Sequence, residues 1–288
     1  MLFEKQAWMV PLQILSGAVD KKQLKPILSM VLVRFNENAV YLTATDLDIE
    51  LTARLPLTEA ATLPAITLPA KRLFDLMRVL DDQAQFEISL RDQQVWIQAA
   101  STLFKCSTLP VDTFPLMKEA SAPVQFSVER VLFIQLLQAT AFAISQQDAR
   151  TFLNGLLIEL DGSTLRAVAA DGHRMALKVE KHAQQLPLTR FVLPRKSVYE
   201  LLRLLTSIED PSIHVCLDPQ VLRVQSAQYT FSSKLMDTPH FPYQQAIPLH
   251  ASTRVSLDRD SLKRALMRVL IIMSDKNRPT VMEVGSEG

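Results

Sequence analysis

The sequence predicts an α+β fold of tandem units in which helices pack on antiparallel sheets, with two complete units and a third that is incomplete. The first observation is an internal duplication. Val192–Leu205 repeats Thr67–Leu80 with six identities in fourteen positions, where ordinary composition would give about one. The second is that the surrounding order of helix and strand signals recurs. The identical pairs, all 125 positions apart, are Leu68/Leu193, Pro69/Pro194, Lys71/Lys196, Leu76/Leu201, Arg78/Arg203 and Leu80/Leu205.

Residues 1–122 form the predicted unit one. The apolar period of Glu4–Leu15 indicates a helix that ends at Ser16-Gly17, and a lysine-rich link follows it. A second helix is expected at Ala70–Leu80, after Leu68-Pro69. Alternating apolar residues between turn signals predict the strands. These are Ile27–Phe35, Ala39–Leu51 (one strand or a pair), Gln85–Leu90, Gln94–Ala99 and Thr102–Leu109.

Residues 123–249 form the predicted unit two, which repeats this order. Its opening helix is expected at Glu129–Ser145 and its second helix at Pro194–Leu205. Two long strands are expected on either side of a turn at Asp161-Gly162. The expected strands are Phe152–Leu160, Leu165–Val179, Ile213–Leu217, Val221–Ser226 and Tyr229–Leu235.

Residues 250–288 are predicted to begin a third unit. Val255-Ser256-Leu257 resembles the start of unit two, Leu262–Met273 has the period of an opening helix, and Thr280–Val284 resembles the start of a strand. The stretch from Val255 to Gly288 has 34 residues, whereas unit two has 117 from Phe126 to Pro242. So short a piece does not bury a core of its own. We therefore expect Leu266, Val269, Leu270 and Ile272 to be exposed unless another surface covers them.

Composition limits the function classes. The net charge is +1, so a role on nucleic acid must rest on local basic faces or on geometry rather than on overall charge. The two cysteines lie in different units without metal-ligand spacing, which fits a reducing, cytoplasmic setting. We expect no export signal, membrane-spanning segment, metal or cofactor.

The two second helices carry basic residues opposite their apolar stripes. Lys71, Arg72 and Arg78 lie on this face in unit one, and Arg195, Lys196 and Arg203 in unit two. Exposed helix faces often carry lysine and arginine, but recurrence at one offset favours a shared electrostatic surface. Such mobile cations attract phosphates without reading bases.

Several short motifs together resemble the bacterial DNA polymerase III beta subunit, the sliding clamp family. They are Thr45-Asp46-Leu47, Leu153-Asn154-Gly155, Ala170-Asp171-Gly172-His173-Arg174, Leu193-Pro194-Arg195-Lys196, Ser233-Lys234-Leu235 and Phe241-Pro242. The resemblance implies tandem DNA-clamp units with pairs of helices lining a central hole, and two chains of three units closing a ring on duplex DNA. It also implies a non-enzymatic role in which the ring tethers the polymerase III catalytic subunit, the clamp loader and other DNA-handling proteins.

The resemblance also implies site residues. Besides the helix cations, the positions near DNA are Lys22, Gln147, Thr151 and Phe152; the last two stand where the family commonly has tyrosines. Partner proteins of the family insert a short hydrophobic peptide between the second and third units. The matching positions here are Leu153, Ala170, Gly172, His173, Arg174, Met175, Pro242, Gln245, Ala246 and Asn277. Ala170 replaces a usual threonine and Asn277 a large apolar residue, so we expect weak peptide binding.

The resemblance places ring closure on two surfaces, the strand with Phe104 and Cys106 and the region of Ile272 and Met273. With the sheet of the third unit absent, we expect this closure to fail. A monomer, or an irregular assembly through exposed edges that does not load as a clamp, is then expected instead of the family homodimer.

Two further readings remain open. Asp46, Asp48 and Glu50 alternate along an expected strand, so one face could hold Mg²⁺ for a nuclease, although a solvated sheet face explains them as well. The chain could also be an interaction module that binds clamp or clamp-loader subunits without encircling DNA.

Overall fold

The computed structural model describes residues 2–19, 25–57, 63–91, 94–118, 123–248, 254–272, 280–283 and 285. The chain divides into two compact bodies, Met1–Phe241 and Pro242–Gly288. Among the described residues, no helix is both long and apolar enough to cross a membrane.

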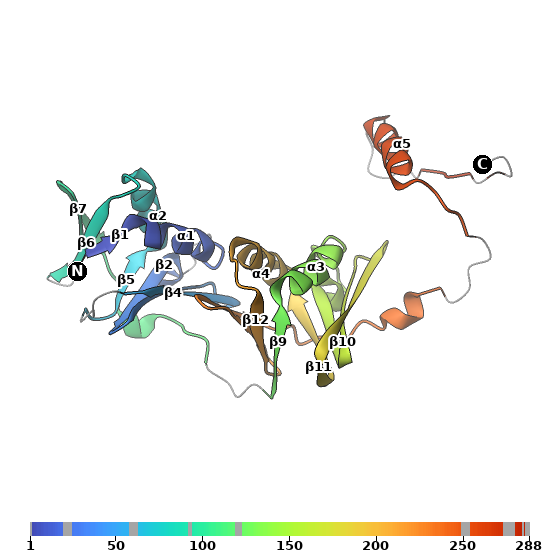
Figure 1. Ribbon diagram of the computed structural model, residues 1–288, viewed down its shortest axis with the longest axis horizontal. Coiled ribbons are helices and arrows are strands. Elements are labelled where there is room, and N and C mark those ends of the chain that lie inside the picture. Colours follow the sequence, from blue (N-terminus) through green and yellow to red (C-terminus); the bar gives the residue numbers. More distant parts are fainter. Residues whose placement is uncertain are drawn as a thin grey trace. The chain divides into compact units, whose positions relative to one another are not determined.

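In its described residues, the first body combines four α-helices with three antiparallel sheets (Figure 1). The helices are α1 (Lys5–Leu15), α2 (Ala70–Val79), α3 (Arg130–Ala141) and α4 (Arg195–Ser207). The strands are β1 (Leu2–Glu4), β2 (Met30–Asn36), β3 (Ala39–Thr45), β4 (Ile49–Pro56), β5 (Ile66–Pro69), β6 (Gln85–Arg91), β7 (Gln94–Ala99), β8 (Thr102–Ser107), β9 (Val124–Glu129), β10 (Gly155–Ala170), β11 (Met175–Pro194), β12 (Ser212–Leu217), β13 (Val221–Gln225) and β14 (Tyr229–Lys234). The α+β prediction is confirmed.

The sheets connect the two units. Their strand orders are β1-β6-β7-β8, β10-β11 and β5-β2-β3-β4-β14-β13-β12-β9. The third sheet has eight strands and contains both units, because β4 of unit one pairs with β14 of unit two. Leu51 on β4 lies opposite Phe231 on β14, and both side chains are buried. The boundary between the units is therefore a backbone ladder with an apolar core.

The internal duplication is visible in the strand registers. In unit one Met30 lies opposite Pro69, and in unit two Gly155 lies opposite Pro194, both shifted by 125 positions. At the β3–β4 turn of unit one, Thr45 lies opposite Glu50, and this pair recurs at the far end of the β10–β11 ladder as Ala170 opposite Met175. Because a shift of one residue would turn every side chain to the other face, equal registers mean equal core faces.

The second helices form for the same reason in both units. α2 and α4 each follow a proline, whose fixed φ ends the preceding strand and whose missing N–H is not needed at a helix start. α2 buries Leu73, Leu76 and Met77 in the hydrophobic core. α4 buries Val198 and Leu201, which match Leu73 and Leu76, together with Leu204 and Leu205. The predicted apolar stripes are therefore confirmed at most positions, whereas the prediction is wrong at Tyr199, which is exposed.

Some predicted boundaries are wrong. The expected turn at Asp161-Gly162 does not end a strand, because β10 continues through it with shifts of register and a left-handed φ of 57° at Gly162. The opening helix of unit two ends at Ala141 rather than Ser145, and Phe152 lies in a 3₁₀ turn that precedes β10. The two-strand reading of 39–51 is correct, since the chain turns at 46–48.

The second body has one described helix, α5 (Arg259–Ile272). It begins three residues before the predicted start at Leu262. Leu266, Leu270 and Ile271 are 41%, 65% and 84% exposed, so the expected exposure of apolar residues on this helix is confirmed at Leu266 and Leu270. It is wrong at Val269, which is half-buried. The expected strand at Thr280–Val284 is wrong for the part that is described, since 280–283 have no strand structure.

Candidate nucleic-acid and partner-binding interface

The basic residues of α2 are exposed on the solvent side of this helix. They are Lys71, Arg72 and Arg78. In the described part of the chain, Lys71 and Arg78 have no hydrogen bond or ion pair. Arg72 lies near Cys106, where burial raises the pKa of the thiol and the positive charge of Arg72 opposes that rise. This face is available to an anion such as phosphate.

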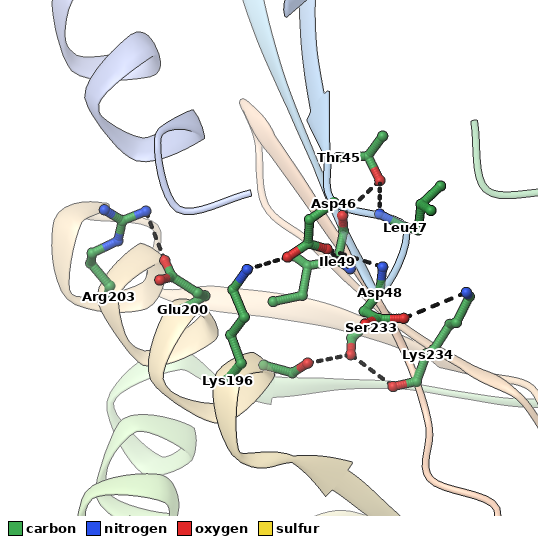
Figure 2. Close-up of polar contacts among 11 residues, drawn as sticks. Thr45, Asp46, Leu47, Asp48, Ile49, Lys196, Glu200, Arg203, Ser233 and Lys234 are labelled. Carbon is green, nitrogen blue, oxygen red and sulfur yellow. Dashed lines mark hydrogen bonds and ion pairs between the residues drawn. The ribbon is translucent and has the colours of Figure 1, made fainter. Parts of the chain in front are cut away.

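The matching residues of α4 are engaged at the boundary between the units. Figure 2 shows the Lys196 ammonium group against the carboxylate of Asp46, which belongs to unit one. Arg203 donates to the carbonyl oxygen of Ile14 at 2.7 Å and pairs with Glu200 at 2.8 Å. The recurrence of these cations therefore has a second explanation besides phosphate attraction: they connect α4 to the neighbouring unit.

Arg195 and the predicted link residues lie close to the ends of helices in unit two. Arg195 donates to the carbonyl oxygen of Ile144 at 2.5 Å, and its guanidinium lies over the Tyr199 ring. Gln147 and Thr151 are exposed. The Phe152 ring is half-buried because it stacks on Phe241, with 5.9 Å between ring centroids. The predicted position Lys22 lies outside the described residues.

An ion pair lies in the link between α3 and β10. Arg150 binds both carboxylate oxygens of Asp148, with Nε and Nη2 each at 2.9 Å. These hydrogen bonds lower the pKa of Asp148 to about 2. Bidentate pairing of this kind fixes the geometry of a short loop, although an exposed pair contributes little to stability.

The β10–β11 turn brings together most of the predicted peptide-pocket residues. Asp171 accepts hydrogen bonds from the backbone N–H groups of His173 and Arg174, both at 3.0 Å, which closes the turn. Burial would raise the pKa of Asp171, but these bonds and Arg174 lower it overall. Gly172 has a φ of 87°, a conformation that favours glycine.

The other members of this predicted set differ in exposure. Leu153 and Ala170 are buried, Met175 is half-buried, and His173 and Arg174 are exposed. Arg174 also donates to the carbonyl oxygen of Phe142 at 3.0 Å. Pro242, Gln245 and Ala246 belong to the second body, where Gln245 and Ala246 lie in a 3₁₀ turn. Asn277 lies outside the described residues.

A pocket between units one and two, lined from unit two by Asp218, Gln220, Val221 and Lys234, includes the unit-one positions that match this set. It has a volume of about 490 Å³. Thr45 and Leu47, at the β3–β4 turn, line one side, and Pro115, Leu116 and Lys118 line another. Thr45 and Leu47 precede Ala170 and Gly172 by 125 positions, and Pro115 precedes Pro242 by 127. The residues that line this pocket in unit one therefore occupy the same repeat positions as the predicted peptide-pocket residues of unit two.

The predicted closure residues lie on β8 and α5. Phe104 is half-buried and Cys106 is buried on β8, whose only strand partner among the described residues is β7. Ile272 is the last residue of α5, and Met273 lies outside the described residues.

The three carboxylates that suggested a nuclease do not form a metal site. Asp46 and Asp48 lie in the β3–β4 turn rather than on a strand face, so only Glu50 has the expected strand position. Asp46 caps the turn and binds Lys196, Asp48 lies 3.5 Å from Lys234, and Glu50 accepts from the Met117 N–H at 2.7 Å. Among the described residues, no group of three acidic, histidine or cysteine side chains is placed to hold a metal ion. The nuclease alternative is therefore contradicted at these residues.

Two features of the sequence were not used to predict contacts. Asp46 and Asp171 share the 125-residue offset, which could have indicated a structural role for both turns. Glu159 has a side chain that is 3% exposed, and it binds Arg166 at 2.8 Å and Arg190 at 2.5 Å. An isolated charge would not be buried in this way. Arg166 is seven positions away and Arg190 is 31 positions away, so no helical or adjacent-residue spacing predicts the two contacts.

Comparisons with known proteins agree with this architecture. Residues 1–118 match the family model for the DNA polymerase III beta subunit, N-terminal domain, and residues 127–243 match that for its central domain. The beta sliding clamp of Pseudomonas aeruginosa is 35% identical over 276 residues, which cover 96% of this chain and 75% of the relative. The beta sliding clamp of Escherichia coli (strain K12) is 32% identical over 275 residues, with the same coverage of 96% and 75%.

Solved structures give the same result. The crystal structure of the DNA polymerase III subunit beta from Pseudomonas aeruginosa has a TM-score of 0.91 and 34% identity, covering 96% of this chain and 75% of that one. Another Pseudomonas aeruginosa clamp structure was solved bound to griselimycin. The Caulobacter crescentus pol III beta structure has a TM-score of 0.89 and 30% identity over 96% of this chain and 75% of that one. The family is that of a non-catalytic processivity factor, and this chain, which spans three quarters of the length of these relatives, belongs to the DNA polymerase III beta subunit family of sliding clamps.

Proposed function

We propose that this chain forms an arc of a sliding clamp, which surrounds duplex DNA in the cytoplasm and tethers a replicative polymerase to it. The observation that carries the proposal is the repeated module, with the same strand registers in both units and one continuous sheet across their boundary. A clamp retains DNA by enclosing it, so it needs a rigid curved wall more than a high net charge. The value of +1 is compatible with that role.

The proposed DNA-facing groups are cations and polar residues that make no base-specific contacts. The set is Lys22, Lys71, Arg72, Arg78, Gln147, Thr151, Phe152, Arg195, Lys196 and Arg203. The exposed α2 cations are free to approach phosphate, whereas Lys196 and Arg203 already have protein partners. We therefore expect the α2 cations to contribute more to DNA attraction than their counterparts on α4. Removing one cation that touches a phosphate should reduce the salt dependence of binding by about one unit in the slope.

The proposed partner site is the β10–β11 turn with its neighbours, and its ligand is a short hydrophobic peptide of the polymerase catalytic subunit or of the clamp loader. The buried pair Leu153 and Ala170 provides an apolar floor, while His173 and Arg174 are exposed at the rim. Ala170 lacks the hydroxyl that Thr45 has at the matching position of unit one, where it donates to the Ile49 carbonyl oxygen at 2.8 Å. We expect peptide affinity weaker than low micromolar.

A retention assay tests the enclosing role. The chain is loaded with clamp loader on nicked circular DNA, and the amount retained is compared before and after the DNA is linearised. Retention that is lost on linearising supports a clamp. Retention that does not depend on circularity, or its complete absence together with capture of a full-length clamp subunit, supports instead the interaction module that does not encircle DNA.

A charge variant separates topological retention from electrostatic attraction. Lys71→Ala with Arg78→Ala should weaken binding to linear duplex DNA at low salt, whereas Asp148→Asn, in the link of unit two, serves as a charge-changing control with no expected loss. Fluorescence anisotropy with a labelled clamp-binding peptide tests the partner site separately. A dissociation constant in the low micromolar range would contradict the expected weakness.

A further inference from the structure

The pocket between units one and two lies entirely within the first body, since its lining residues all fall between Thr45 and Lys234. Its volume of about 490 Å³ is within the range of about 300–1,000 Å³ that is typical of ligand pockets. The β3–β4 turn and the loop after β8 line it from unit one, and the β12–β13 turn lines it from unit two. None of the residues proposed above for DNA or for the partner peptide belongs to this lining. The pocket therefore has no role in the functions described so far.

The unit-one wall of the pocket is held in shape by internal hydrogen bonds. Thr45 Oγ1 donates to the Ile49 carbonyl oxygen at 2.8 Å and accepts from the Leu47 N–H at 3.1 Å (Figure 2). The Glu50 carboxylate accepts from the Met117 N–H at 2.7 Å, which fixes the loop after β8 against β4. A ligand would not have to order this wall on binding, so it would lose less free energy in forming the complex.

Leu47 has a backbone conformation that its side chain disfavours. Its φ is 80°, a value that bulky residues rarely adopt, and the matching residue of unit two, with a φ of 87°, is Gly172. Strained residues of this kind cluster at ligand-binding sites. The Leu47 side chain is half-buried and lines the pocket. Since the turn of unit two closes with glycine, the leucine is not needed for the turn, and what it adds is an apolar group in the pocket.

The unit-one pocket also differs in charge from the matching set of unit two. Lys118 stands where unit two has Gln245, at an offset of 127. Lys118 is exposed and has no hydrogen bond or ion pair in the described part of the chain. Lys234, on the other wall, lies 3.5 Å from Asp48, whose side chain is 74% exposed, so water screens this pair. Asp218 accepts the backbone N–H groups two and three residues later at 2.7 and 2.8 Å, which engages it in its own turn. The pocket therefore offers two cations to a ligand.

We propose that this pocket binds a short acidic peptide segment of a partner protein, with leucine-like side chains against Leu47 and Leu116 and a carboxylate near Lys118 and Lys234. Leu116 is 44% exposed, so a ligand would remove apolar surface from water. The two lysines would favour negatively charged segments over neutral ones. The inference takes its ligand class from the proposed partner site of unit two, and it adds a second site with a preference for negative charge.

The two sites would differ in what they select. The unit-one pocket has Thr45, Leu47 and Lys118, whereas the matching residues of unit two are Ala170, Gly172 and Gln245. The first set provides a larger apolar wall and a positive charge. An acidic segment should therefore prefer the unit-one pocket.

Methionine methyl NMR tests the two sites separately. Met117 lines the unit-one pocket and Met175 belongs to the proposed site of unit two, and both are half-buried. The full chain with isotope-labelled methionine methyl groups is titrated with acetyl-Leu-Asp-Leu-Glu-amide, and Met117→Leu and Met175→Leu assign the two signals. We expect a saturable shift of the Met117 signal. Replacing both acidic residues of the peptide by their amides should weaken the binding about three- to tenfold.

Two pocket variants and a matched control locate the binding. Lys118→Glu reverses an exposed charge, and Leu47→Gly removes an apolar side chain at a φ that glycine tolerates. Each should weaken binding of the acidic peptide about tenfold. Lys181→Glu makes the same charge change at an exposed lysine of β11 that does not line the pocket, so it should leave the dissociation constant unchanged. Circular dichroism checks that all three variants are folded.

The second site and the proposed function can fail independently. A Met117 signal that does not move at millimolar peptide, equal affinity for the acidic and the amide peptide, or equal losses in Lys118→Glu and Lys181→Glu would each overturn the second site. The Met175 signal is followed in a separate titration with the clamp-binding peptide. If it does not respond, the proposed partner site of unit two is wrong, whatever the Met117 signal does with the acidic peptide.

Discussion

Unit one and unit two have the same strand registers but different turns between the strands that meet the next unit. The turn is Asp46-Leu47-Asp48 in unit one and Asp171-Gly172-His173 in unit two. In both, the first aspartate accepts the backbone N–H groups two and three residues later. In both, the middle residue has a positive φ, 80° for Leu47 and 87° for Gly172.

Comparing the two turns shows which residues the turn conformation itself requires and which residues depend on the neighbouring surface. The aspartate is present in both units because its carboxylate closes the turn. The following residues vary with their neighbours. Asp48 contacts unit two and Glu50 the loop after β8, whereas His173 and Met175 lie just before and at the start of β11, which pairs only with β10 in the described part of the chain. Differences between the two turns therefore follow the surfaces that each turn contacts.

The largest expected difference in stability is between β14, which has a strand on both sides, and β8, which pairs only with β7 among the described residues. Phe231 on β14 is fully buried at the internal junction, so Phe231→Ala should lower the free energy of unfolding by about 3–5 kcal/mol. Phe104, at the matching position of β8, is only half-buried, so Phe104→Ala should cost about half as much. Urea denaturation followed by circular dichroism measures both. Equal losses would mean that the two strands are equally covered.

The turn residues give the next largest difference. Gly172→Ala should destabilise the fold by about 1–2 kcal/mol, because an alanine is strained at this φ. Leu47→Gly should change stability by less than about 0.5 kcal/mol, since relief of the same strain offsets the packing that a half-buried leucine provides. Thermal unfolding of both variants measures the two effects. A similar loss of stability in each would contradict the view that both positions need a residue that tolerates a positive φ.

The recurrent lysines should differ by less. Lys196→Ala removes an ion pair whose lysine side chain is 52% exposed, so the expected cost is about 0.5–1 kcal/mol. Lys71→Ala should have no measurable effect on the stability of the isolated chain, because its ammonium group has no partner among the described residues. Chemical denaturation at about 0.1 M and about 1 M salt tests this, and salt should reduce only the Lys196 effect. A salt-sensitive loss for Lys71→Ala would indicate a partner for it.

The smallest effect concerns pH at the link of unit two. The pKa of Asp148 is lowered to about 2 by its bonds to Arg150. The contribution of this pair to stability is therefore complete above the ordinary aspartate pKa and is lost as the pH falls towards 2. Arg150→Gln removes the guanidinium but leaves the backbone N–H bond to Asp148, so it should raise the pKa of Asp148 towards the ordinary aspartate value without reaching it. An NMR titration of the carboxyl carbon checks this, and an unchanged pKa would assign the shift to another group.

The repeated elements could be predicted from the sequence because their signals are local. Leu193-Pro194 before an apolar-periodic helix predicts α4 once Leu68-Pro69 and α2 are recognised. The pairing of β4 with β14 could not be predicted in this way, since Leu51 and Phe231 are far apart in the chain and nothing in either strand specifies the other. For the same reason Lys196 was interpreted as a phosphate-facing residue. Its nearest charge, Asp46, is 150 positions away.

The β4–β14 ladder has a mechanical consequence. Backbone hydrogen bonds run across the boundary of the two units without a flexible joint, so bending there would break several of them together with the Leu51–Phe231 contact. The first body should therefore resist bending between its two units when a force is applied. Any ring built from it would then have to open at an interface between separate chains, and not at the β4–β14 boundary inside the first body.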